Sequence, residues 1–239
     1  MKLIFIRHGE PDYSIDSLTE KGWREAELLT GRIEKWDITD IYCSPLGRAR
    51  DTAKLFLEKS GRTAEICDWL REFPARVLKE DGTKRGPWDL LPSHFAVTDD
   101  YFSSEKWLDT KLMSSGDVKE KYLAVTGGID EILRAHGYAR EGRYYRVMKE
   151  NRDTLVFFCH FGVMCVILSH LINIPPVALW QGTYVAPTSV TILHTEEREE
   201  GIAYFRSACI GDISHLNAAD EPVSFSGRFC ETFHSDERH

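Results

Sequence analysis

The chain has 239 residues, of which 42% are hydrophobic and 28% are charged, so it can bury a core and is not disordered by composition. Its formal net charge of −8 argues against unspecific binding to nucleic acid or to anionic lipid, because both need clustered lysine and arginine. A small anionic substrate is compatible with this charge, since the field inside a cleft can oppose the net charge.

Targeting and cysteine usage favour a cytoplasmic protein. Only four apolar residues separate Lys2 from Arg7, which is too short for a secretory signal, and no apolar run is long enough to span a membrane. The six cysteines are scattered, which favours reduced thiols over a structural disulfide. No CxxC or HExxH spacing occurs, so neither a metal site nor a cofactor is predicted. A homodimer is left open.

The first third of the sequence predicts strands alternating with helices. Residues 3–6 are a continuous apolar run rich in β-formers, which predicts a buried parallel strand. Residues 38–43 predict a second strand, after which Ser44 is expected to cap a helix whose first residue is Pro45. Residues 64–70 are expected to form a third strand. The helix between the first two strands is predicted by apolar residues at spacings of three and four: Trp23, Ala26, Leu29, Ile33 and Trp36.

The pattern changes in the middle of the chain and then returns. Residues 73–116 contain three prolines and no clear period, which predicts an irregular insertion. Apolar spacing predicts a helix over 118–132, and a further helix is expected to begin at 144–149. Later elements are expected as a strong strand at 155–159, an apolar helix at 163–174, two strands at 189–194 and 202–207, and a polar, loosely held tail at 221–239.

These elements predict an α/β fold. Strands that alternate with helices imply three layers, α/β/α, around a mainly parallel central sheet. We expect one domain over residues 1–239, with an irregular and helical insertion at about 73–146 lying over the active site. Ligands of such sheets bind beyond the carboxyl ends of the strands. His8 and His160 both follow a predicted strand directly, so both belong at that edge.

Candidate chemistry begins with the tetrapeptide at residues 7–10. A histidine such as His8 can attack phosphorus through an unprotonated ring nitrogen, provided that a hydrogen bond holds its other nitrogen. Arg7 supplies a forked donor for phosphate oxygens, and Gly9 lets the backbone approach closely. As a short string this is weak, because a histidine at a strand end is often structural.

A second anion-binding feature follows the second strand. Arg48 lies in the first turn of the predicted helix, beside free backbone N–H groups and the positive end of the helix dipole. Arg50 lies on the same turn. Two arginines there oppose the dipole, so a bound anion explains them better than ordinary solvation does.

Four features in this order resemble the histidine phosphatase (phosphoglycerate mutase-like) superfamily. They are the RHGE motif at residues 7–10, the LTEKG motif at 18–22 followed by Ala26, the segment 44–53, and His160. The match covers residues 1–72 well and 154–215 moderately. An element at 211–216 also matches, and its His215 is expected to be structural or peripheral.

The resemblance implies a role for each matching residue. His8 would be the phosphorylated nucleophile, Arg7, Arg48 and His160 would clamp the phosphoryl group, and Glu72 would be the general acid. Asp81, Asp89 and Glu10 are rival acids. Phosphate contacts are also expected at Gly9, at Ser14, where the family often has Asn, and at Phe161, where it often has Gly. The Gly and Trp that usually follow the acid are not evident after Glu72.

We therefore expect a metal-independent phosphomonoester hydrolase that acts through phosphohistidine on a small phosphorylated metabolite. The alternatives are a mutase of the phosphoglycerate mutase type and a non-catalytic module that binds a phosphate ligand or a protein. In the insertion, Lys79, Lys84 and Arg85 either meet a further anionic group or are solvated. The aromatic residues there either line an organic leaving group or pack the insertion on the body: Trp88, His94, Tyr101, Phe102 and Trp107.

Overall fold

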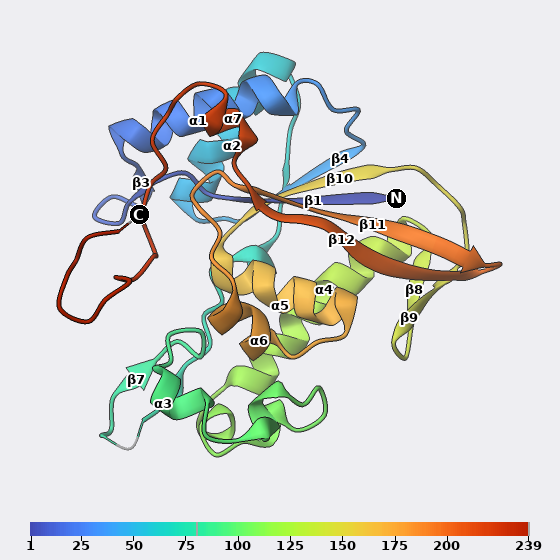
Figure 1. The fold of residues 1–239 in the computed structure, drawn as a ribbon. Coiled ribbons are helices and arrows are strands. Elements are labelled where there is room, and N and C mark those ends of the chain that lie inside the picture. Colours follow the sequence, from blue (N-terminus) through green and yellow to red (C-terminus); the bar gives the residue numbers. More distant parts are fainter. Residues whose placement is uncertain (80, 239) are drawn as a thin grey trace.

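A computed structural model of the chain describes residues 1–79 and 81–238. Glu80, in the predicted insertion, and His239, at the end of the predicted tail, lie outside the described residues. The central feature is an eight-stranded sheet with helices on both faces (Figure 1). Its strands are β1 (Lys2–Arg7), β4 (Asp40–Cys43), β5 (Glu65–Ile66), β8 (Tyr138–Glu141), β9 (Tyr144–Val147), β10 (Thr154–Cys159), β11 (Val190–Glu199) and β12 (Ile202–Asp212).

The sheet is mixed, and its parallel part carries the predicted histidines. The strand order is β5-β4-β10-β1-β11-β12-β9-β8. β5, β4, β10 and β1 run parallel to one another, and the strands from β11 to β8 are antiparallel to their neighbours. All of β10 and all of β1 after Lys2 are buried, as expected for central strands covered on both faces.

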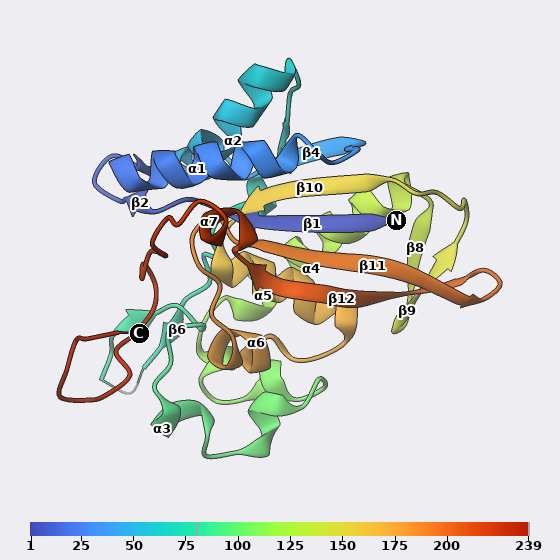
Figure 2. The same ribbon diagram turned by 45° about the horizontal axis from the view of Figure 1, so that its top comes forward.

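Two helical layers cover the sheet, which confirms the predicted α/β/α arrangement (Figures 1 and 2). One layer holds α1 (Glu20–Ile33), α2 (Gly47–Ser60) and the short α7 (Ser214–Asn217). The other holds α4 (Val118–Ala135), α5 (Phe161–Ile172) and α6 (Pro176–Gly182). Side chains of β1 alternate between the two layers: Ile4 and Ile6 join one apolar cluster, and Leu3 and Phe5 join the other. No helix in the described part of the chain has the length and apolar character to cross a bilayer.

Three local predictions were wrong. α2 begins at Gly47, two residues after the expected start, because the backbone of Leu46 is still extended. The third strand, expected over 64–70, is only the two-residue β5, and a 3-10 turn follows it. The segment 144–149, expected to begin a helix, is β9 instead. Its Tyr145 is buried against Phe205 of β12, with ring centroids 5.0 Å apart, so tertiary packing decides this short aromatic stretch.

The predicted insertion divides into two parts. The described residues of 73–116 are irregular and lie beside α6, below the sheet in Figure 1. They hold the antiparallel pair β6 (Val77–Leu78) and β7 (Lys84–Arg85), the short α3 (Pro92–Phe95) and three 3-10 turns. The stretch from α4 to β9 instead belongs to the layered body, because α4 covers the sheet and β8 and β9 form its edge.

The start of the C-terminal segment is anchored, contrary to the expected loose tail. Lys21 forms an ion pair of 2.8 Å with Glu221, and the Tyr184 hydroxyl donates to the carbonyl oxygen of Ser224 at 2.8 Å. Ser224 itself is 3% exposed. Further along, Phe233 is 93% exposed, so the anchoring is confined to the first part of the segment.

Because α1 packs closely against the loop after β1, there is no room for a side chain at Gly22. A Cβ at Gly22 would lie 2.3 Å from the carbonyl oxygen of Glu10, whereas a Cβ at Gly31 of the same helix would meet nothing within 4 Å. We predict that Gly22→Ala lowers the free energy of unfolding by roughly 1–3 kcal/mol. Gly31→Ala should raise it by about 0.5–1 kcal/mol, because alanine favours helix. Urea unfolding measures both, and a similar effect of the two changes would contradict the packing described.

Candidate active site

The two predicted histidines meet at the carboxyl edge of the sheet. β1 and β10 pair in parallel with Arg7 opposite Cys159, so both strands end at the same level. The backbone N–H of His8 donates to the carbonyl oxygen of Cys159 at 3.1 Å. The imidazole centroids of His8 and His160 are 5.0 Å apart, and the residues are only 2% and 0% exposed. Two residues far apart in sequence thus form one buried pair.

His8 is held as a neutral base with one free nitrogen. Its Nδ1 lies 2.7 Å from the carbonyl oxygen of Gly9, and a carbonyl can only accept, so Nδ1 carries the proton. Nε2 therefore keeps its lone pair. Burial lowers the pKa of His8 well below its ordinary value, and the positive charges of Arg7 and Arg48 lower it further. The ring is neutral near pH 7, as a nucleophile must be.

The loop after β1 is fixed by contacts that the sequence did not predict. Gly9 donates its N–H to the Thr52 hydroxyl of α2 at 2.9 Å, so this N–H serves the loop and not a ligand. A Cβ at Gly9 would lie 2.9 Å from the carbonyl oxygen of Gly22. The N–H of Glu10 donates to Oε2 of the fully buried Glu25 at 2.8 Å. These contacts hold the loop that carries His8 against α1 and α2.

His160 is oriented by Ser44, whose contact with this ring the sequence analysis did not predict. The Ser44 hydroxyl lies 2.8 Å from Nε2 of His160, and Ser44 is fully buried. Its place in the sequence could have indicated this contact, because Ser44 directly follows β4, and β4 pairs in parallel with β10. Nδ1 of His160 is buried and has no hydrogen-bond partner among the described residues. Burial lowers the pKa of His160 well below its ordinary value, and the adjacent His8 ring and the positive charges of Arg48 and Arg7 lower it further.

Both predicted arginines are anchored through Nη1. Arg7 donates from Nη1 to the carbonyl oxygens of Val185 at 2.6 Å and Ser226 at 3.1 Å. Arg48 donates from Nη1 to Oδ1 of Asp16 at 2.6 Å, and Oδ2 of Asp16 accepts the N–H of Gly47 at 2.7 Å. Asp16 thus fixes Arg48 at the start of α2, a role that the sequence analysis did not assign.

Arg7, Arg48 and His160, which we call the clamp, share a further property. Nε of Arg7, Nε of Arg48 and Nδ1 of His160 are all buried without a hydrogen-bond partner in the described chain. Buried polar groups are nearly always paired, so three unpaired groups in one set of neighbours need an explanation. Arginine Nε always donates, and Nδ1 of His160 can donate, so the set is suited to an oxyanion. Arg50, by contrast, is exposed and faces away on α2.

Glu72 is the predicted acid that the structure brings to this site. Its Oε1 accepts the N–H groups of Phe73 and Gly162, each at 2.9 Å. Burial raises the pKa of Glu72, and the two N–H groups and both clamp arginines oppose this rise only in part. The rival acids are engaged elsewhere: Glu10 accepts from Thr19 at 2.9 Å, Asp81 from Thr83 at 2.6 Å, and Asp89 pairs with Arg85 at 3.3 Å.

Ser14 and Phe161 show no contact with the clamp. Ser14 is exposed, and both its N–H and its hydroxyl donate to Oδ1 of Asp12, at 2.9 and 2.6 Å. Its neighbour Tyr13 instead stacks on the Arg48 guanidinium, 5.4 Å from the ring centroid. Phe161 is the first residue of α5 and packs on an apolar cluster. Their phosphate-binding roles stay predictions.

The remaining candidates have structural positions. His215 is 8% exposed, and its Nε2 lies 3.1 Å from the Thr188 hydroxyl, as expected for a structural histidine. Tyr101 and Trp107 are buried and pack the insertion on the body. Trp88 is different, because it lies beside Glu72 and Gly162. Lys84 and Arg85 are exposed on β7.

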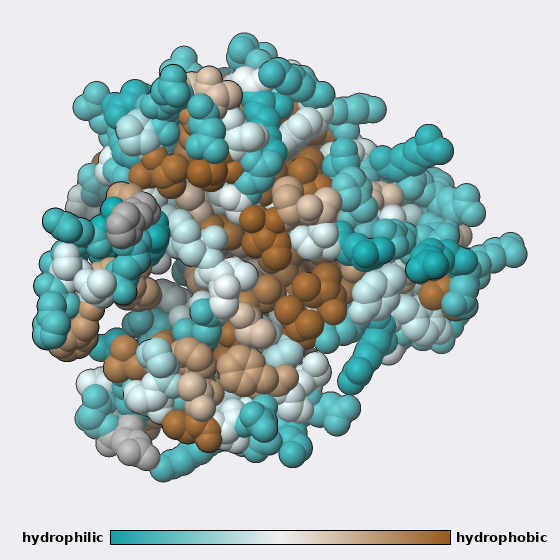
Figure 3. Space-filling view, in the orientation of Figure 1, coloured by the Kyte–Doolittle hydropathy of each residue, from teal (hydrophilic) through white to brown (hydrophobic). Residues whose placement is uncertain are grey.

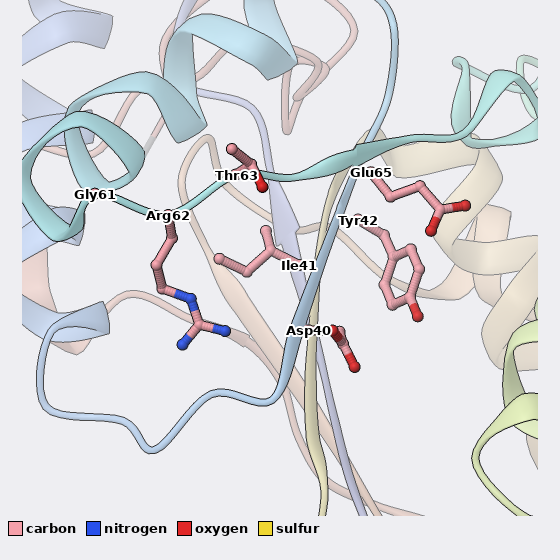
Figure 4. A pocket seen from close by; sticks show the side chains of 7 residues that line it. All are labelled: Asp40, Ile41, Tyr42, Gly61, Arg62, Thr63 and Glu65. Atoms are coloured by element: carbon pink, nitrogen blue, oxygen red, sulfur yellow. The ribbon is translucent and has the colours of Figure 1, made fainter.

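Three cavities of the described residues lie away from the histidines. One of about 400 Å³ is lined by Asp40, Tyr42 and Glu65 beside β4, and Figure 4 shows Tyr42 and Arg62 on opposite sides of this strand. Another of about 670 Å³ follows α2, and a third of about 170 Å³ lies beside Arg140. The histidines line none of them, because their rings are covered. Figure 3 shows a hollow between the C-terminal segment and the insertion, on the side that leads to this edge of the sheet.

Ser226 and Gly227 of the C-terminal segment cover the guanidinium of Arg7. Besides the bond from Arg7 to the Ser226 carbonyl, Gly227 packs so closely that its Cβ would lie 3.0 Å from Nη2 of Arg7. Gly227 has a φ of +80°, which favours glycine. The segment therefore completes the surroundings of the clamp.

Fold and geometry together define an α/β protein with a site that is suited to an oxyanion. Two buried histidines, two buried arginines and the half-buried carboxyl of Glu72 lie beyond the ends of parallel strands, where such folds bind ligands. Nothing comparable exists for metal: no group of three or more His, Cys, Asp or Glu in the described chain is placed to hold an ion.

Comparisons with known proteins agree with this class. Residues 3–85 match the model of the histidine phosphatase superfamily (branch 1). The adenosylcobalamin/alpha-ribazole phosphatase of Salmonella typhimurium is 24% identical over 191 residues, covering 75% of this chain and 84% of that protein. Over residues 3–85 the chain is therefore similar to the histidine phosphatase superfamily, in agreement with its fold and its site geometry. Its relatives support a phosphatase activity and do not determine the substrate.

Solved structures share the fold. A phosphoserine phosphatase of Entamoeba histolytica superposes with a TM-score of 0.57 at 18% identity, covering 90% of this chain and 98% of that one. A mycobacterial glucosyl-3-phosphoglycerate phosphatase gives a TM-score of 0.59 at 20% identity, covering 88% and 98%. These similarities concern the architecture.

Gly227 allows a test of the cover over Arg7. Gly227→Ala and Gly201→Ala both place alanine at a positive φ, of 80° and 78°, and each should cost roughly 1–2 kcal/mol of stability. Only at Gly227 does the new Cβ press on Arg7, since a Cβ at Gly201 meets nothing within 4 Å. We expect Gly227→Ala to lower kcat/KM for p-nitrophenyl phosphate roughly tenfold, because a displaced clamp misplaces the phosphoryl group. An equal loss in the Gly201 variant would contradict this assignment.

Glu25 makes stability depend on pH. Burial raises its pKa from 4.5 to about 7, so the folded state binds a proton more tightly than the unfolded state does. The contribution of Glu25 to stability should be complete below pH 4.5 and should be lost as pH rises to about 7. In Glu25→Gln this loss is absent, so the variant should gain about 3 kcal/mol relative to the wild type between those pH values. Urea unfolding at several pH values measures this, and parallel curves for the two proteins would contradict it.

Proposed function

We propose that this chain is a phosphomonoester hydrolase that acts through a phosphohistidine intermediate on a small phosphorylated metabolite. The observation that carries the proposal is the set of three unpartnered, buried nitrogens on Arg7, Arg48 and His160, next to a neutral His8 whose Nε2 is free. An oxyanion would satisfy the donors, and a phosphorus atom would be the electrophile for the free nitrogen.

In the first step, Nε2 of His8 attacks phosphorus. The N–P bond forms as the bond from phosphorus to the ester oxygen breaks, and Glu72 gives its proton to the leaving oxygen. The carbonyl oxygen of Gly9 accepts a hydrogen bond from the Nδ1–H of His8 throughout, which holds the ring in the attacking tautomer. The raised pKa of Glu72 supports its role as the acid, because a carboxyl must be protonated to donate.

In the second step, water attacks the phosphohistidine. The Glu72 carboxylate takes a proton from the water, the P–N bond breaks, and phosphate leaves with His8 neutral again. Charge on the equatorial oxygens is met by Arg7, Arg48 and His160 in both steps. Since these side chains supply the positive charge, the proposed reaction proceeds without a metal ion.

The two alternatives predict different outcomes. A phosphoglycerate mutase of Thermoplasma acidophilum is 38% identical over 65 residues, covering 23% of this chain and 32% of that protein. This similarity keeps a mutase reaction worth testing, by assaying interconversion of 2- and 3-phosphoglycerate beside phosphate release. A non-catalytic binding module would bind phosphate or vanadate without releasing phosphate from any ester.

The proposal extends to the domain organisation, the compartment and the class of ligand. We take residues 1–239 as one domain with an insertion at about 73–146 that borders the site. In the cytoplasm its cysteines would stay reduced, and the six thiols are unpaired in the described chain, four of them buried. The net charge of −8 supports a small substrate over nucleic acid as the ligand.

The intermediate gives the most direct test. Rapid quenching with a ³²P-labelled ester should yield acid-labile, alkali-stable label on the wild type at His8. His8→Ala should lose the label and lower turnover by at least about a thousandfold, because a covalent route requires the nucleophile. Trp36→Ala, in the turn that follows α1, serves as a control that keeps both. Undiminished turnover in His8→Ala would exclude the mechanism.

A further inference from the structure

The carboxyl of Glu72 is enclosed by groups from three parts of the chain. Its Oε1 accepts the N–H of Phe73 and the N–H of Gly162 in the first turn of α5. The third group is the indole of Trp88. The point where a Cβ of residue 162 would lie is 2.6 Å from Oε1 of Glu72 and 3.0 Å from Cδ1 of Trp88. Glycine at 162 thus leaves a gap that the carboxyl and the indole fill together.

Trp88 is held firmly in this place. Its Nε1 donates at 3.4 Å to the carbonyl oxygen of Phe73, the residue whose N–H binds the Glu72 carboxyl. Its own carbonyl oxygen accepts from Nε2 of Gln181 in α6 at 3.4 Å. Gly86 lies so close that its Cβ would be 2.8 Å from the indole. The ring therefore cannot turn away without breaking contacts on several sides.

The position of Trp88 has a chemical consequence. The proton of Glu72 must reach the leaving oxygen, so the leaving group has to lie beside this carboxyl. An indole against a carboxyl excludes water and disfavours the charged form. Trp107 and Tyr101 also lie in the insertion, but they are buried in the apolar core, whereas Trp88 is partly exposed beside Glu72.

We propose that Trp88 is a positioning residue, which shields the Glu72 carboxyl from water and keeps it directed at the leaving oxygen. This role rests on the proposed function. It makes the insertion part of the acid catalyst, with the indole arriving after the β6–β7 hairpin. Esters of poor leaving groups, which need a proton, should depend on Trp88 far more than esters of good leaving groups do.

The test compares two esters across a range of pH. For Trp88→Ala we expect kcat for glycerol 2-phosphate to fall roughly 10- to 100-fold, while kcat for p-nitrophenyl phosphate changes less than about threefold. The alkaline limb of the glycerol 2-phosphate profile should move to lower pH, because a wetter carboxyl loses its proton earlier. Trp88→Phe should restore most of the rate and the profile. Trp36→Ala, which changes another half-buried tryptophan, should leave both esters unaffected.

A second variant covers the case in which Trp88→Ala does not fold. Gly162→Ala forces the carboxyl and the indole apart and should give the same split between the two esters. An equal loss on both esters with an unchanged pH profile in folded variants would overturn the role of Trp88. If the wild type forms phosphohistidine in that case, the proposed function stands and only this role falls. If the wild type forms none, the proposed function fails as well.

Discussion

The parallel pairing of β1 with β10 is the constraint on which the site depends. It sets Arg7 opposite Cys159, and the next residue on each strand is a histidine. A slip of one residue in this register would turn alternate side chains to the other face of the sheet, so the buried apolar side chains of both strands fix it. The imidazole pair is therefore specified by the core. The same edge receives Ser44 from β4, which is the next parallel strand.

A second constraint is electrostatic. The site buries two guanidinium groups and two imidazoles, and burial of a cation costs free energy unless an anion compensates. Arg48 has Asp16 as its counter-ion, whereas the described bonds of Arg7 go to backbone carbonyls. Burial accordingly lowers the pKa of Arg7 and of both histidines. Arg7 and Arg48 thus place positive charge near His8, and the proposed phosphate ester would bring negative charge to the same place.

Sequence patterns predicted much of this arrangement because the relevant signals were local. Strong apolar runs located β1 and β10, and the residues after them located both histidines. What the sequence could not supply was set by contacts between distant segments. Ser44 was expected only to cap a helix, and its hydroxyl also contacts the ring of His160. Tyr145 looked helical and became a strand because β12 was available as a partner. Asp16, Glu25 and Trp88 carry no motif of their own, and their contacts with Arg48, Glu10 and Glu72 exist only in the folded chain.

The contact between Arg7 and the Ser226 carbonyl joins residues that are 219 positions apart in sequence. During translation His8 emerges before His160, and the carbonyl that holds Arg7 emerges after both. A ribosome-bound nascent chain therefore displays His8 before its surroundings are complete. Deletion of the segment around Ser226 would also act directly on Arg7, the residue beside His8.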